Sequence, residues 1–231
     1  IRPVTWRMKR ICRCAPFFGD RSVTDYYMAE PLKNYFNIEL VTSLSRKIEE
    51  IYPDFDIDGF VRQVFDQAWE RKELKQRMRH ITESLHDYLP EEFSRAANIL
   101  KSVPVNVGGF EYMFLPDYIE LYGLESFKES ISALEHFTPF ASAEFAVRPF
   151  IKKYGDEMMN QMESWAMSGN PHVRRLASEG CRPRLPWAMA LPEFKNNPGP
   201  ILPVLEKLKS DESEYVRRSV ANNLNDISKD N

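Results

Sequence analysis

Three carboxylates in the C-terminal half of the chain lie where acidic side chains could stabilise a positive charge. Glu144 and Glu179 each close a short segment rich in alanine and serine. The final repeat aligns Asn222 with Glu179, and Asp226 follows Asn222 by one helical turn on the same face. We therefore expect Glu144, Glu179 and Asp226 to project from neighbouring helical repeats toward one groove.

Arginines flank these carboxylates, and an aromatic side chain follows them. The arginines are Arg148, Arg175, Arg182, Arg184 and Arg218, and the aromatic residue is Trp187. Carboxylates beside arginines suit a polyanionic ligand that develops a positive charge at one atom. Hydrolysis of an N-glycosidic bond in DNA does this, because the departing base leaves an oxocarbenium-like sugar. The pattern predicts that the carboxylates stabilise this cation, that Trp187 presses on the base or deoxyribose, and that the arginines bind phosphates.

Each of these signals also has a purely structural interpretation. In HEAT repeats the arginine of a Val-Arg pair commonly pairs with an acid of the neighbouring repeat, and a single tryptophan is usually a packing residue. The four histidines form no metal-ligating spacing, so we predict neither a metal nor another cofactor. Cys181 lies among the arginines but has no evident base partner, which favours a structural role.

The elements that must position these residues are helices. Apolar residues recur at helical spacing in three successive segments, namely 38–51, 60–68 and 74–89. Thr138-Pro139 and Asn170-Pro171 are typical of an N-cap followed by proline in the first turn.

An internal repeat indicates how these helices are arranged. Val173-Arg174-Arg175 reappears as Val216-Arg217-Arg218 at a separation typical of HEAT repeats. The sequence therefore predicts an all-α fold, an α-solenoid of HEAT-like helical repeats with a concave DNA-binding groove.

The composition favours a globular intracellular protein. The chain has 231 residues, of which 43% are hydrophobic, and it carries a net charge of −3. An overall negative charge opposes DNA binding, but residues 171–190 hold four arginines against one acid, so one face can still be basic. Three cysteines do not form a disulfide framework, and no apolar run is long enough to span a membrane. We expect a cytoplasmic monomer.

The domain organisation changes near Met28. Residues 1–27 lack a stable apolar period, and Met28-Ala29-Glu30-Pro31 looks like a natural protein start. We therefore expect residues 1–27 to be a non-native or misassigned extension and residues 28–231 to form the HEAT-like repeat domain.

Beyond the repeat itself, two C-terminal segments resemble a known family. Segment 170–187, with Asn-Pro-His-Val-Arg-Arg-Leu-Ala-Ser-Glu-Gly followed by Arg-Pro-Arg-Leu-Pro-Trp, is similar to the signature of the AlkC branch of bacterial DNA alkylation-repair glycosylases. Segment 215–229, with Tyr-Val-Arg-Arg-Ser-Val-Ala-Asn-Asn-Leu-Asn-Asp-Ile-Ser-Lys, is equally similar. The resemblance extends back to Met28.

This resemblance implies a glycosylase that excises positively charged lesions from double-stranded DNA. The lesions would be 3-methyladenine and also 3-methylcytosine, and no metal would be needed. By motif matching, the active-site residues would be Glu144, Glu179, Asp226 and Trp187. Some family members continue into an immunoglobulin-like domain, whereas this sequence stops at Asn231, so we expect either a short form or a missing C-terminal domain.

A second hypothesis is a noncatalytic HEAT-repeat scaffold that binds a protein or DNA. The two hypotheses differ in what they require of the carboxylates. An enzyme needs Glu144, Glu179 and Asp226 at one groove, whereas a scaffold leaves them free to lie on separate faces.

Overall fold

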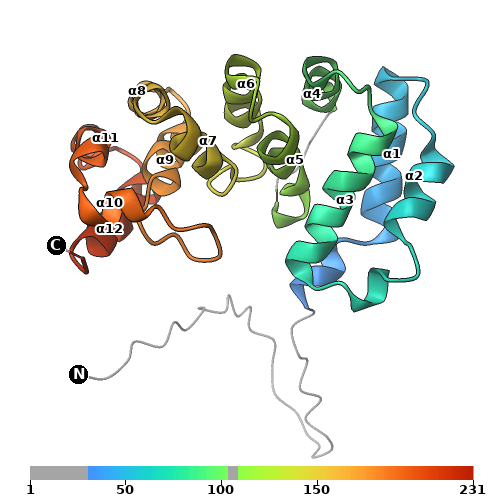
Figure 1. Cartoon of the computed structure of the whole chain (residues 1–231), viewed down its shortest axis with the longest axis horizontal. Helices are drawn as coiled ribbons and strands as arrows, with labels where there is room; N and C mark the ends of the chain where they lie inside the picture. The colour runs from blue at the N-terminus through green and yellow to red at the C-terminus, as the bar shows by residue number, and fades with distance from the viewer. Residues whose placement is uncertain (1–30, 104–108, 231) are drawn as a thin grey trace, which may run out of the picture. The chain divides into compact units, whose positions relative to one another are not determined.

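The computed structural model describes residues 31–103 and 109–230, in which the regular elements are helices joined by turns and loops (Figure 1). The extension predicted for residues 1–27 lies outside the described residues. The α-helices are α1 Ile38–Ile51, α2 Ile57–Val64, α3 Leu74–Tyr88, α4 Phe93–Ser102, α5 Phe114–Tyr122, α6 Phe127–Phe137, α7 Val147–Tyr154, α8 Asp156–Trp165, α9 Pro171–Gly180, α10 Pro192–Asn196, α11 Leu202–Leu208 and α12 Glu214–Ile227. Four short 3₁₀ helices, η1 Leu32–Tyr35, η2 Trp69–Arg71, η3 Phe110–Tyr112 and η4 Gly199–Ile201, join them. No strand occurs in these two ranges.

The helices pack mainly against near neighbours in the chain. Helix α2 contacts both α1 and α3, α8 contacts both α7 and α9, and α9 contacts α12. Such nearest-neighbour packing distinguishes a repeat solenoid from a bundle around one central axis. The prediction of an all-α fold built from HEAT-like repeats is confirmed.

The apolar spacing places the core as expected in the first helices. In α1, Val41, Leu44 and Ile48 are buried, and Asn37 caps the helix by accepting a hydrogen bond from the Leu40 N–H. Helix α3 begins at a capping box in which Glu73 and Gln76 satisfy each other's backbone N–H groups. These helices therefore follow from local sequence alone.

Helix α2 is shorter than its sequence pattern predicted. The apolar spacing continues to Ala68, but the helix ends at Val64. The Asp66 carboxylate accepts a hydrogen bond from the Ala68 N–H, which holds a turn that competes with helical backbone.

Of the two predicted N-caps, one is confirmed and the other is wrong. The Asn170 side chain accepts from the His172 N–H, and Pro171 opens α9. Thr138 instead closes α6, because its own N–H donates to the Leu134 oxygen.

The Val-Arg-Arg repeat is a packing element. Val173 of α9 and Val216 of α12 are buried, and the two helices lie against each other. Arg174 forms a bidentate ion pair with Asp211, at 2.6 Å from Nε and 3.0 Å from an Nη atom. Arg217 donates to the backbone oxygens of Asp211 and Glu212. Arg174 therefore forms the ion pair that the structural interpretation predicts, whereas Arg217 is exposed and bonds to the turn before its own helix.

The repeat alignment fails for the earlier segment. Glu179 lies in the last turn of α9, but Glu144 lies in a turn that precedes α7. Arg148 and Arg182 differ in the same way, since Arg148 is inside a helix and Arg182 follows one. The two segments share residue types but not backbone conformation.

Replacing Asp211 with asparagine should lower the free energy of unfolding at pH 7 by about 1–3 kcal/mol, because the buried Arg174 guanidinium loses its carboxylate partner. Arg174 holds the pKa of the Asp211 carboxyl below its usual value. The ion pair therefore stabilises the fold above the unfolded pKa of about 4 and is lost as the pH falls through the lower folded pKa. Urea titrations of both proteins from pH 7 to pH 3 should show a difference that narrows in acid. A constant difference would contradict this account.

Candidate active site

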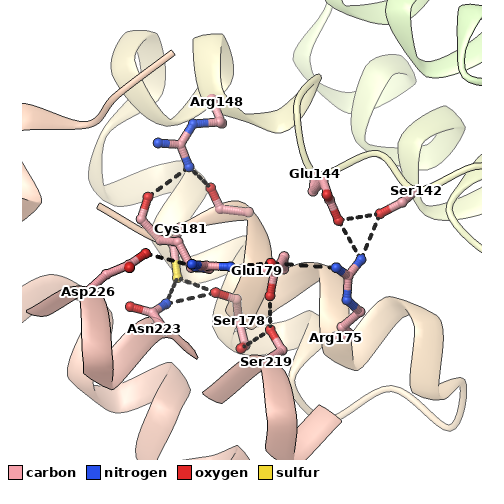
Figure 2. A network of polar contacts seen from close by, with 12 residues as sticks. Ser142, Glu144, Arg148, Arg175, Ser178, Glu179, Cys181, Ser219, Asn223 and Asp226 are labelled. Carbon is pink, nitrogen blue, oxygen red and sulfur yellow. Dashed lines mark hydrogen bonds and ion pairs between the residues drawn. The ribbon is translucent and has the colours of Figure 1, made fainter. Parts of the chain in front are cut away.

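The three predicted carboxylates lie in one chain of alternating charges, shown in Figure 2. Arg175 contacts Glu144 and reaches Glu179 at 3.6 Å. Arg182 donates to Glu179 at 2.6 Å and to Asp226 at 2.9 Å. We call Glu144, Arg175, Glu179, Arg182 and Asp226 the charged network.

Different elements contribute the members of this network. Arg175 and Glu179 lie one turn apart on α9, and Arg182 follows the end of that helix. Asp226 comes from the last turn of α12, and Glu144 comes from the turn before α7. Packing of these elements thus brings together carboxylates that are far apart in the sequence.

Hydroxyl groups complete the surroundings of the innermost carboxylate. Glu179 is 5% exposed and accepts a 2.6 Å hydrogen bond from Ser219, which lies 2.6 Å from the Ser178 hydroxyl. Asp226 is 2% exposed. Buried carboxylates need such charged and hydrogen-bonding partners to offset their lost hydration. Both therefore have fixed positions before any ligand binds.

Arg148 is a buried residue that hydrogen-bonds to the backbone of the segment after α9. The residue is 0% exposed, and its guanidinium donates to the backbone oxygens of Gly180 and Arg182, both at 2.8 Å, and of Met189 at 2.6 Å. Burial lowers the pKa of Arg148 to about 10. A guanidinium without exposed surface does not meet a phosphate, so this position corrects the expectation that Arg148 binds DNA. It positions the segment that carries Trp187 instead.

Trp187 lies within that segment. Its side chain is 63% exposed, and its backbone has a φ of 66°, in the left-handed region that residues with a side chain rarely adopt. The ammonium group of Lys75 on α3 donates to the Trp187 carbonyl oxygen. Lys75 therefore stabilises the strained backbone conformation in addition to Arg148.

An open groove of about 540 Å³ lies beside Trp187. Its lining comes from α3, α5 and the Trp187 segment and includes Phe145, the residue directly after Glu144. Asp117 and Glu120 of α5 also line it, and sequence reasoning did not single them out. The available signal was a carboxylate inside the apolar run Phe114–Ile119.

The remaining predicted DNA-binding arginines differ in exposure. Arg184 and Arg218 are exposed and pair with Asp230 and Glu214 respectively. The N–H groups of Arg175 and Arg182 donate to the carboxylates of the charged network. In this structure both arginines therefore hold these acids in position.

Other chemistry finds little support in the described ranges. Cys181 is fully buried, and this burial raises its pKa to about 12, as expected for a structural thiol. Within residues 31–103 and 109–230, no three or more His, Cys, Asp or Glu side chains are grouped as a metal site would require. Nor does any helix there have the length and apolarity needed to cross a membrane.

Comparisons with known proteins agree with this architecture. Residues 201–230 match the HEAT repeat family. The chain is 48% identical over 198 residues to the uncharacterized protein YhaZ of Bacillus subtilis (strain 168), a match that covers 86% of this chain and 56% of that protein.

A solved structure is similar as well. It is the Pseudomonas fluorescens alkylpurine DNA glycosylase AlkC bound to DNA containing an abasic site analog, with 41% identity, a TM-score of 0.83, and coverage of 88% of this chain and 57% of that one. The chain thus spans little more than half the length of either relative. Over the matched part, the chain is similar in sequence and fold to AlkC, and its last helices match a HEAT repeat.

Proposed function

We propose that this protein is a DNA glycosylase that hydrolyses the N-glycosidic bond of cationic alkylated bases in double-stranded DNA. The proposed lesions are 3-methyladenine and 3-methylcytosine. The observation that carries the proposal is the charged network, which brings Glu144, Glu179 and Asp226 together in a chain similar to AlkC.

The carboxylates would act on the sugar through their electric field, since Glu179 and Asp226 are almost fully buried. As the C1′–N bond breaks, its electron pair neutralises the cationic base, and the sugar develops oxocarbenium character. Carboxylates that Arg175, Arg182 and Ser219 already hold in place can stabilise this cation without reorganising, and poorly solvated surroundings strengthen their field. Water then adds to C1′ and releases a proton. A base that is already positive needs no general acid to leave.

Trp187 would meet the lesion directly. Its exposed indole offers a π-face to a cationic base or to deoxyribose, and its tethered backbone keeps that face in place. Arg184 and Arg218 are the predicted arginines with exposed side chains, and we assign phosphate binding to them. The proposed reaction uses no metal or other cofactor, and one copy of the chain supplies every group named here.

The direct test is release of free 3-methyladenine from methylated duplex DNA by the purified chain. Glu179→Gln and Asp226→Asn should each lower the single-turnover rate by about a hundredfold or more, because each removes charge stabilisation that acts in the transition state. DNA affinity should change little.

Asp211→Asn provides the matched control, because it also removes a buried carboxylate from an arginine, but outside the charged network. It should keep wild-type activity when assayed below its melting temperature. A wild-type chain that binds DNA and releases no base at any salt concentration would refute the enzyme and favour the scaffold hypothesis.

Arg184→Gln and Arg218→Gln should weaken DNA binding in a salt-dependent way. Each lost phosphate contact reduces the slope of log affinity against log salt by about 1, with the same effect on methylated and unmethylated duplexes. Fluorescence anisotropy across a salt series measures this slope. Lys128→Gln on α6, a helix without residues in the charged network or the groove, should leave it unchanged. Unaltered slopes for both arginine variants would remove them from the DNA interface.

A further inference from the structure

The groove beside Trp187 has the volume and the lining of a small-molecule site. Its volume of about 540 Å³ lies within the range of ligand pockets, and Met78, Phe145, Trp187 and Met189 give it apolar walls. Trp187 and Met189 are exposed large hydrophobic side chains, so a flat apolar ligand would cover surface that water now touches.

One buried carboxylate in this groove has an unused oxygen. Asp117 is 4% exposed, and its Oδ1 atom accepts a 2.9 Å hydrogen bond from Arg79. Its Oδ2 atom is buried without a hydrogen-bond partner. The nearby Thr82 hydroxyl lies 3.2 Å from the Met78 oxygen and 3.3 Å from the Phe114 oxygen and has one proton to donate between them. Burial raises the pKa of the Asp117 carboxyl, and a weaker interaction with Thr82 acts to lower it. A buried acceptor left over in this way is ready for a donor supplied by a ligand.

A second carboxylate shares the same arginine. Glu120 lies 3.5 Å from the Arg79 guanidinium, so Arg79 forms ion pairs with both carboxylates. Burial, reinforced by the charge of Asp117, raises the pKa of Glu120 to about 7, and burial also raises the pKa of Asp117. Near neutral pH the pair therefore offers a carboxyl O–H donor beside a carboxylate acceptor.

We propose that this groove binds the free alkylated aminopurine that the reaction releases, with 3-methyladenine as the type ligand. The ring would lie against Trp187 and Phe145, its exocyclic amino group would donate to Asp117, and its neighbouring ring nitrogen would accept from Glu120. This inference rests on the proposed function for the origin of the ligand. It adds a site separate from the charged network.

The groove is linked to the charged network along the chain. Phe145 lines it and follows Glu144 directly in the chain, and Trp187 borders it. Lys75 spans the groove by donating to the Trp187 carbonyl while its ammonium group lies 5.2 Å from the centre of the Phe145 ring. The base would thus move from the sugar to Asp117 along one aromatic wall.

Calorimetric titration of the purified chain with free 3-methyladenine tests the site without any DNA. Binding is expected, and 6-methylpurine, which lacks the amino group, should bind about tenfold more weakly because the Asp117 oxygen then stays unpaired. Asp117→Asn and Glu120→Gln should weaken 3-methyladenine binding by a similar factor. Trp187→Phe, a change at an exposed side chain, should also weaken it without unfolding the protein.

Asp211→Asn again serves as control and should bind like the wild type. Equal affinity of the wild-type chain for both purines, or wild-type affinity in Asp117→Asn and Glu120→Gln, would overturn the inference. A chain that releases base from DNA but does not bind free 3-methyladenine would overturn only the product site. A chain that binds the base through Asp117 but releases none from DNA would overturn only the proposed function.

Discussion

Burial of carboxylates is the constraint on which the C-terminal half of this structure depends. A buried carboxylate without a partner costs several kcal/mol, and Glu179 and Asp226 are both almost fully buried. Arg182 is shared between them, and Ser219 completes the coordination of Glu179. The packing of α9 against α12 is therefore inseparable from the position of the acids. Any process that used their charge would find it already oriented.

The same principle applies with opposite sign to Arg148. Its buried charge faces the backbone oxygens of Gly180, Arg182 and Met189, and this arrangement fixes both ends of the segment that bears Trp187. A strained, exposed tryptophan is maintained because its neighbours over-determine its position. Arg148 of α7 thus links the backbone of Arg182, a member of the charged network, to the backbone of Met189, two residues after Trp187.

The carboxylates in the groove beside Trp187 are paired less completely than those of the charged network. There, Arg79 forms ion pairs with both Asp117 and Glu120, and one buried oxygen of Asp117 has no hydrogen-bond partner. The charged network is complete within the protein, whereas the groove is incomplete. This contrast separates groups whose charges are paired within the protein from groups that can still pair with a ligand.

Local sequence was enough to predict the helical class, the cap at Asn170 and the repeat that pairs α9 with α12, because these depend on residue periodicity and on hydrogen bonds between near neighbours. It also selected Glu144, Glu179 and Asp226, although the alignment behind Glu144 was wrong. Tertiary structure alone decided that Arg148 is buried, that Arg175 and Arg182 hold acids, and that Asp117 and Glu120 line a groove with Trp187. Burial and ion pairing are set by residues from other helices, and no local pattern encodes which helices will meet.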